Sequence, residues 1–330
     1  MSLLRIENLA IDLAREGASY RLVQGVSLSV DAGETVAIVG ESGSGKSLTA
    51  LATMGLLAEE LSIGDGRIVF EGRDLAKLDA EAMRAVRGRQ IAMIFQEPMT
   101  SLNPVMSIGN QLTEAMRLNL GFSKQAANDR AISLLEEVGI SDPAGRLKQY
   151  PHQLSGGMRQ RVMIAIALAC EPKLILADEP TTALDVTIQA QILDLTSRLC
   201  REHGLGLVLI THNLGIVARY AKRVVVMYGG RVVEEASAST LYRTPAHPYT
   251  RGLLASVPRL DLSREVSLQP INGAPPDPFE TIDGCRFHPR CPAATAQCRV
   301  DSPPLVSSGD HAVACWNAAQ VPQPLEMEAT

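Results

Sequence analysis

The chain has 330 residues, enough for one large α/β domain and a smaller second one. Its 46% hydrophobic content and mean hydropathy of +0.06 are typical of a globular protein with a substantial core. The net charge is −5, from 31 basic and 36 acidic residues, and no lysine- or arginine-rich tract is present. Broad electrostatic binding of nucleic acid is therefore not expected.

The first predicted elements form a small antiparallel layer and an α/β core. Short alternating runs at Leu4–Leu9, Leu28–Val30 and Arg67–Phe70 predict the antiparallel layer. Five apolar segments predict buried parallel strands, and helical patterns between them indicate a doubly wound core. These segments are Val36–Val39, Ile91–Phe95, Leu174–Ala177, Leu207–Ile210 and Val224–Met227.

Three further features organise the chain. The interval from Pro98 to about Ala169 contains no strand-like run and predicts a helical insertion into the core. Gly229-Gly230 predicts a β-hairpin turn. Because eight of the 19 prolines fall between Pro270 and Pro304, the last part of the chain should hold no long regular element.

A phosphate-binding loop follows the strand at Val36–Val39. Gly40-Glu41-Ser42-Gly43-Ser44-Gly45-Lys46-Ser47 matches GxxxxGK[ST], with a predicted helix from Leu48 to Leu57 behind it. The N–H groups of such a loop, here from Gly40, Ser42, Gly43, Ser44 and Gly45, curl around a phosphate chain at a helix N-terminus. Lys46 should reach the β- and γ-phosphates, and the Ser47 hydroxyl should bind Mg²⁺. The sequence therefore predicts binding of a nucleoside triphosphate.

An acidic pair ends the strand at Leu174–Ala177. Asp178, at the carboxyl end of this strand, suits indirect coordination of Mg²⁺. Glu179 is placed to accept a proton from the water that attacks the γ-phosphate. A solvated acidic turn is the alternative, but the phosphate-binding loop favours the catalytic interpretation.

Ser155-Gly156-Gly157 precedes a long apolar helix from Arg161 to Cys170. Ser155 is a good N-cap, and the two glycines leave the first N–H groups of the helix accessible. A capped helix after a flexible turn would explain these residues on their own. Their place just upstream of the Asp178-Glu179 strand gives them a second meaning: with the phosphate-binding loop, this arrangement resembles the ATP-binding-cassette (ABC) ATPases.

The resemblance implies roles at matching positions. Gln96 corresponds to the glutamine that touches Mg²⁺ and the attacking water, and His212 to the histidine that contacts the γ-phosphate. Ala183-Leu184-Asp185 matches the loop that crosses the dimer interface. The resemblance therefore implies that Asp185 belongs to the nucleotide site. Tyr20 is the nearest candidate for the aromatic residue that stacks on adenine.

In this family the motif at Ser155-Gly156-Gly157 closes over the nucleotide bound by a second cassette. The chain has one phosphate-binding loop and one such motif, so the resemblance implies a dimer that sandwiches two ATP molecules. The partner would be a second copy or, as we expect, a homologous but non-identical chain. ATP then joins Lys46 to the partner's motif, and hydrolysis releases the link.

Longer strings are similar to the ATP-binding subunits of dipeptide and oligopeptide importers, a group that includes nickel importers. They are Gln96-Glu97-Pro98-Met99-Thr100-Ser101-Leu102-Asn103-Pro104, Pro245-Ala246-His247-Pro248-Tyr249-Thr250, Gly252-Leu253-Leu254, Gly273-Ala274-Pro275-Pro276 and Gly284-Cys285-Arg286-Phe287-His288-Pro289-Arg290-Cys291-Pro292. One departure is Glu234-Glu235-Ala236, where this group usually has a glycine; no functional consequence is expected.

This similarity implies the rest of the assembly. The ATPase would lie at the cytoplasmic side of the membrane, held by two transmembrane permease subunits, while an extracytoplasmic binding protein delivers the solute. A cleft near Gln96 would receive a short permease helix. The expected domains are an ABC-type α/β core over 1–244, with its helical insertion over 98–169, and an irregular cysteine-rich extension over 245–330.

The cysteines divide into two groups. Cys170 and Cys200 fall in helical patterns and are expected in the core. The remaining four, in a reducing compartment, favour a metal over disulfides. They are Cys285, Cys291, Cys298 and Cys315. Their spacing leaves zinc and an iron–sulfur cluster open, whereas similar tails in this importer group imply a 4Fe–4S cluster. His288 is an alternative ligand, but with four cysteines present it is expected to be a bystander.

Three alternatives remain for the function. A soluble ABC ATPase of DNA repair or translation usually has two cassettes or a coiled-coil insertion, and basic surfaces. An iron–sulfur redox protein could use ATP for gating, but its cysteines lie at the far end of the chain from Lys46. An importer of nickel or another non-peptide solute fits the same motifs. The chain lacks a signal-peptide core and its longest central apolar run, Val162 to Cys170, is too short for a membrane span, so we expect a cytosolic, peripheral protein.

Overall fold

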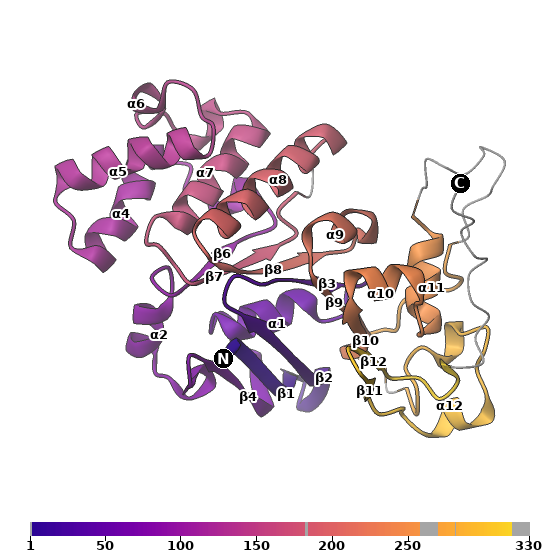
Figure 1. Cartoon of the computed structure of the whole chain (residues 1–330). Helices are drawn as coiled ribbons and strands as arrows, with labels where there is room; N and C mark the ends of the chain where they lie inside the picture. The colour runs from indigo at the N-terminus through magenta and orange to yellow at the C-terminus, as the bar shows by residue number, and fades with distance from the viewer. Residues whose placement is uncertain (1, 182–183, 258–269, 281, 319–330) are drawn as a thin grey trace, which may run out of the picture. The chain divides into compact units, whose positions relative to one another are not determined.

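The computed structural model describes residues 2–181, 184–257, 270–280 and 282–318 (Figure 1). The chain forms two compact units. Unit 1 comprises residues 1–4, 30–35 and 70–210, and unit 2 comprises residues 5–29, 36–69 and 211–330. Across the described ranges, every helix is too short or too polar to cross a lipid bilayer.

Unit 1 contains a parallel sheet of β6 (Ile91–Ile94), β7 (Leu174–Asp178) and β8 (Gly206–Thr211). Ile91 aligns with Leu174, and Leu174 aligns with Gly206. Nearly every residue of these strands is buried, as their continuous apolar runs predicted. The parallel core strands expected here are confirmed.

Residues 98–169 contain helices and no strand, as the sequence predicted. In Figure 1 the longer helices of this region, α4, α5 and α7, pack against one another. Each of them is preceded by a serine whose side chain accepts a hydrogen bond from a backbone N–H group of the first turn. The helices are α3 (Pro98–Ser101), α4 (Ile108–Leu120), α5 (Lys124–Glu137), α6 (Pro143–Arg146), the 3₁₀ turn η2 (Pro151–Gln153) and α7 (Gly156–Leu168). Unit 1 further holds β5 (Arg73–Asp74), η1 (Leu75–Lys77), α2 (Ala80–Val86) and α8 (Val186–Glu202).

The small antiparallel layer has the order β2-β1-β4. Its strands are β1 (Ser2–Arg15), β2 (Ala18–Asp31) and β4 (Leu61–Phe70), all longer than the short runs predicted. Glu16 and Gly17 join β1 to β2 with φ angles of 53° and 80°, the left-handed conformation that a tight hairpin requires.

Unit 2 also contains a mixed sheet. β3 (Thr35–Val39) runs parallel to β9 (Arg223–Tyr228), and β10 (Arg231–Ser237) returns antiparallel to β9. The turn between them is Gly229-Gly230, with φ angles of 52° and 80°, so the predicted hairpin is confirmed. The helices around this sheet are α1 (Lys46–Thr53), α9 (Leu214–Tyr220), α10 (Ala238–Arg243) and α11 (Pro248–Ala255).

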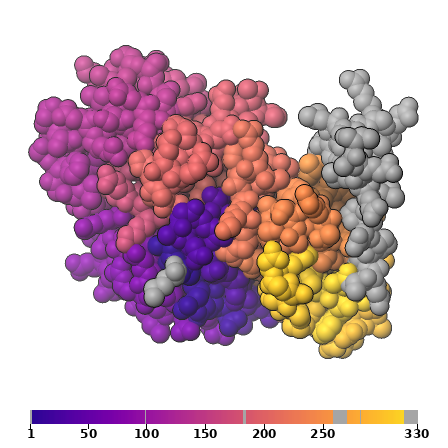
Figure 2. Space-filling view, viewed as in Figure 1, coloured from indigo at the N-terminus to yellow at the C-terminus, as the bar shows by residue number. Residues whose placement is uncertain are grey.

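The C-terminal segment contributes to the same sheet, which the sequence did not predict. β12 (His311–Val313) pairs with β10, and β11 (Val306–Ser308) pairs with β12. The remaining elements of this segment are short, namely η3 (His288–Arg290) and α12 (Ala296–Val300). In Figure 2 the yellow surface of this segment is continuous with the orange surface of the residues that precede it.

A buried carboxylate fastens this segment to β10. Glu234 is fully buried and accepts hydrogen bonds from the N–H groups of Ala246 and His247, at 2.7 and 2.9 Å. Nε2 of His311 lies 2.7 Å from the same carboxylate. His247 is itself fully buried, which lowers its pKa to about 3 and keeps the ring neutral. The Glu234-Glu235-Ala236 stretch thus carries a structural anchor.

The helix after the phosphate-binding loop ends earlier than expected. A helix from Leu48 to Leu57 was predicted, but α1 stops at Thr53. Gly55 adopts a φ of 60°, and the N–H of Leu56 donates to the carbonyl of Leu51 at 2.9 Å. This is a Schellman cap, in which a left-handed glycine ends the helix and satisfies its last carbonyls.

Candidate nucleotide-binding site

The phosphate-binding loop connects β3 to α1 in unit 2, as the sequence predicted. The backbone φ angles of Gly40, Gly43 and Gly45 are 153°, 80° and 95°, which residues other than glycine rarely adopt. A Cβ on Gly40 would lie 2.1 Å from the carbonyl oxygen of Met227. Only glycine therefore fits at this point of the loop, and backbone N–H groups can approach a phosphate.

Lys46 opens α1 and is 4% exposed. Its ammonium donates to the carbonyl oxygens of Gly40 and Glu41 at 2.8 and 2.9 Å, and to Oγ of Ser44 at 3.2 Å. The half-buried Ser47 follows in the first turn of the helix. The positive charge and the hydroxyl needed for a magnesium triphosphate are thus placed on the loop itself.

Unit 1 brings together two predicted catalytic side chains. Nε2 of Gln96, just after β6, donates to Oε2 of Glu179 at 3.0 Å. Glu179 follows the buried Asp178 and has a φ of 45°, a left-handed conformation that is strained for a residue other than glycine. The N–H of Glu179 donates to the carbonyl of Ile210 on β8 at 2.9 Å, which holds this backbone in place.

The motif at Ser155 also lies as expected. Ser155 caps α7 by accepting the N–H of Met158, so Gly156 and Gly157 form the first turn of that helix. An added Cβ on Gly156 would lie 3.4 Å from Leu184, and one on Gly157 would lie 3.2 Å from Ile188. The start of α7 therefore lies beside the start of α8.

Asp185 caps α8 by accepting the N–H of Ile188 at 2.9 Å. Ala183, which precedes it in the predicted dimer-crossing loop, lies outside the described residues. Because α7 and α8 start side by side, Asp185 lies near the Ser155-Gly156-Gly157 motif within unit 1.

Tyr20 and His212 belong to unit 2. His212 is exposed directly after β8. The Tyr20 ring, on β2, contacts the edge of Phe279 at a centroid distance of 5.2 Å. Arg15 lies over the same Phe279 ring, 4.9 Å from its centroid. An aromatic residue of the C-terminal segment thus lies beside the predicted adenine-stacking tyrosine.

The four C-terminal cysteines line one small cavity together with His288. Burial raises the pKa of Cys285, Cys291 and Cys315, the last to about 11, and the neighbouring thiolates add to this rise. In the ranges that the structure describes, no three His, Cys, Asp or Glu side chains form a metal-binding group. The expected core cysteines, Cys170 and Cys200, are buried as predicted.

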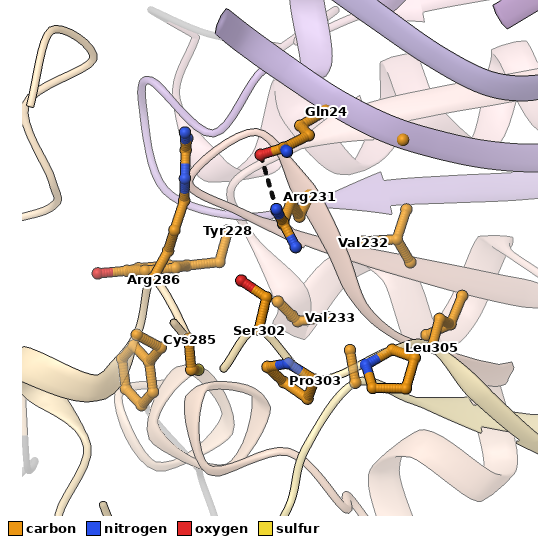
Figure 3. Close-up of a pocket in the computed structure, with 14 residues that line it drawn as sticks. Gln24, Tyr228, Arg231, Val232, Val233, Cys285, Arg286, Ser302, Pro303 and Leu305 are labelled. Carbon is orange, nitrogen blue, oxygen red and sulfur yellow. Dashed lines mark hydrogen bonds between the residues drawn. The ribbon is translucent and has the colours of Figure 1, made fainter. Parts of the chain in front are cut away.

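A larger pocket of about 290 Å³ adjoins the cysteine segment (Figure 3). Arg231 and Arg286 line it, and Nε of Arg231 donates to Oε1 of Gln24 at 3.1 Å. Burial lowers the pKa of both arginines, and the charge of Arg231 lowers that of Arg286 further. In Figure 3, Pro303 lies across the pocket from Gln24, so the C-terminal segment forms one wall of a pocket whose other walls come from β2, β9 and β10.

Sequence reasoning missed two residues that touch the phosphate-binding loop. Both Tyr249 and Arg290 bind Glu41, the second residue of the loop. Each stands inside one of the C-terminal strings quoted above for their resemblance to importer subunits. Those strings could have suggested a role, but not the residue that they contact.

Comparisons with known proteins agree with this geometry. Residues 23–182 match the family model for ABC transporters, and residues 233–298 match that for the oligopeptide/dipeptide transporter C-terminal region. The chain is 50% identical over 315 residues to the dipeptide transport ATP-binding protein DppD of Bacillus subtilis, covering 95% of this chain and 94% of that protein. The chain belongs to the ABC transporter ATPases of the oligopeptide/dipeptide group.

Two further comparisons support the assignment. DppD of Escherichia coli K12 is 48% identical over 305 residues, covering 92% of this ABC ATPase and 93% of that protein. A dimeric structure of the ATP-binding cassette MJ0796, in a post-hydrolysis state bound to ADP and Pi, has a TM-score of 0.64 at 27% identity. The match covers 71% of this chain and 98% of the MJ0796 chain. The protein is therefore an ATPase with the ABC α/β fold.

Proposed function

We propose that this ABC ATPase powers the import of peptides across the cytoplasmic membrane. The observation that carries the proposal is the match over 95% of the chain to a dipeptide transport ATP-binding protein, which includes the C-terminal region. The same match disfavours a soluble ATPase of DNA repair or translation and an iron–sulfur redox enzyme. It also favours peptides over nickel as the solute.

Each predicted site residue then has a role. Lys46 and the loop N–H groups bind the phosphates, Tyr20 stacks on adenine, and His212 contacts the γ-phosphate. Glu179 accepts the proton of the attacking water, which Gln96 helps to orient. The Ser47 hydroxyl and the Gln96 amide oxygen are hard oxygen ligands of the kind that Mg²⁺ prefers, and the Asp178 carboxylate would coordinate it indirectly. Bound Mg²⁺ would neutralise phosphate charge.

The assembly follows from the same proposal. Ser155, Gly156, Gly157 and Asp185 act on the nucleotide of a second, homologous ATPase subunit. Two permease subunits dock at the helical insertion, and an extracytoplasmic binding protein delivers the peptide. The ATPase is peripheral at the cytoplasmic side of the membrane. In domain terms we propose a nucleotide-binding core over 1–244, with its insertion over 98–169, and a C-terminal extension over 245–330.

The assembly predicts the behaviour of the protein in detergent. The chain should co-purify from solubilised membranes with two permease chains and a second ATPase subunit. In proteoliposomes, the complex should take up a labelled dipeptide when ATP and the binding protein are supplied. Recovery with nucleic acid, or uptake of nickel in place of dipeptide, would contradict the proposal.

We further propose that Cys285, Cys291, Cys298 and Cys315 hold a 4Fe–4S cluster, with zinc as the alternative. The proposal is supported by the four thiols that line one cavity, since iron–sulfur clusters are held by four cysteine thiolates. Such a cluster would hold the proline-rich extension together, since metal binding stabilises segments with little regular structure.

Anaerobically purified protein should be brown, with broad absorbance at about 400 nm and about four iron atoms per chain. Replacing Cys298 by Ser should remove most of the colour and iron. The matched control is Cys200→Ser, which changes a core cysteine of α8 and should leave both unaffected. Colourless protein with one zinc ion per chain would contradict the cluster.

A further inference from the structure

Glu41, between Gly40 and Ser42 of the phosphate-binding loop, is bound through all of its polar groups. Its carbonyl oxygen accepts from the ammonium of Lys46 at 2.9 Å. Its N–H donates to the hydroxyl of Tyr249 at 2.8 Å. Its carboxylate accepts two hydrogen bonds from Arg290, at 2.7 and 3.1 Å. Glu41 therefore links Lys46 to two residues of the C-terminal extension.

The Arg290 side chain is held rigidly. It is 5% exposed, whereas the side chain of Glu41 is 26% exposed. Its remaining donors bind the carbonyl oxygens of Asn272 and Ile271, and the hydroxyl of Tyr228 lies 3.3 Å from Nη1. The hydrogen bonds that Arg290 donates to the Glu41 carboxylate raise the pKa of Arg290 further above its usual value. A bidentate arginine–carboxylate pair of this kind fixes orientation as well as charge.

Tyr249 gives the second support. It is the second residue of α11, is fully buried, and packs its ring against Tyr228 and Phe287 at centroid distances of 4.6 and 5.4 Å. Its hydroxyl is therefore a fixed acceptor for the N–H of Glu41. Because Arg290 directly precedes Cys291, the contacts run from the cysteine-lined cavity to the loop.

We propose that Arg290 and Tyr249 are positioning residues of the ATP site, which hold Glu41 and thereby orient Lys46 toward the phosphates. This inference rests on the proposed role of the loop in binding ATP. It assigns the extension a part in nucleotide binding, since two of its residues set the conformation of a loop near the other end of the chain.

The charge of Glu41 makes the expected effect specific. A carboxylate beside a triphosphate repels it, unless a cation neutralises the carboxylate. Removing Arg290 alone should leave that charge unpaired and free the loop, so ATP binding weakens. Replacing both Glu41 and Arg290 should weaken ATP binding less than replacing Arg290 alone, because no unpaired charge remains. Saturating ATP should restore most of the turnover, because Arg290 does not act on the reacting atoms.

The experiment measures the affinity of the full-length chain for a fluorescent ATP analogue, together with KM and kcat of the assembled transporter. Arg290→Gln should raise Kd and KM for ATP about tenfold with kcat within about twofold of wild type, where tenfold corresponds to about 1.4 kcal/mol. Arg290→Lys should lie between wild type and Arg290→Gln, because it keeps the charge without the bidentate geometry. Tyr249→Phe should raise Kd about threefold.

The double variant Glu41→Gln/Arg290→Gln should recover most of the affinity, which a merely structural role of Arg290 would not predict. The matched control is Arg299→Gln, an exposed arginine on α12 of the same extension, which should bind ATP as wild type does. A folded Arg290→Gln variant with wild-type affinity would overturn the inference. If that variant does not fold, Arg290→Lys and the double variant decide in the same way. Failure of the wild-type chain to bind ATP would instead overturn the proposed function.

Discussion

Replacing Glu179 by Gln is expected to slow ATP hydrolysis by the assembled transporter about 10²- to 10⁴-fold, with ATP affinity close to that of wild type. The amide is nearly the same shape as the carboxylate and can still accept the hydrogen bond from Nε2 of Gln96. It cannot accept the proton of the attacking water. The closed, ATP-bound dimer should therefore accumulate.

Single-turnover kinetics and ATP titration of the Glu179→Gln complex provide the measurement. Glu202→Gln is the control, since Glu202 is an exposed residue near the end of α8 that pairs with Arg198. That variant should hydrolyse ATP at the wild-type rate. If Glu179→Gln turned over ATP as fast as the control, another group would have to be the base.

Replacing Lys46 by Ala should weaken ATP binding at least about 100-fold, because it removes the cation that we propose faces the β- and γ-phosphates. The hydrogen bonds from Lys46 to the carbonyl oxygens of Gly40 and Glu41 are lost as well, so the loop also loses its internal brace. Equilibrium titration with an ATP analogue should show almost no saturation at concentrations that saturate wild type.

Lys173→Ala is the matched control for Lys46→Ala. Lys173 is more than half exposed and pairs with Glu71 rather than with any predicted nucleotide-binding residue. Its removal should leave ATP affinity unchanged, since exposed ion pairs contribute little. Wild-type ATP affinity in a folded Lys46→Ala variant would remove this lysine from the phosphate site.

Local patterns predicted much of the fold and of the ATP site. The strand at Thr35–Val39, the glycines that follow it and the Ser155 cap of α7 can be predicted from neighbouring residues alone. Their physical causes act within a few positions, such as apolar runs, left-handed backbone and N-capping. The end of α1 also has a local cause, because the left-handed Gly55 stops the helix before the end of the apolar pattern that predicts it to Leu57.

Local patterns did not predict the contacts between residues that are far apart in the sequence. The sequence predicts separate roles for Gln96 and Glu179, whereas the fold brings their side chains within 3.0 Å across 83 positions. Similarly, β12 pairs with β10, although the sequence of the C-terminal segment that contains β12 shows no strand pattern. The three residues of β12 are too few to display an alternation of apolar and polar side chains.

The sequence by itself determined that this chain binds ATP, because a phosphate-binding loop is defined by residues next to one another. Only the tertiary structure decided what holds that loop, since Arg290 meets Glu41 across 249 positions. Which arginine finds which carboxylate depends on the path of the whole chain, and no local pattern of charge or hydrophobicity records that path.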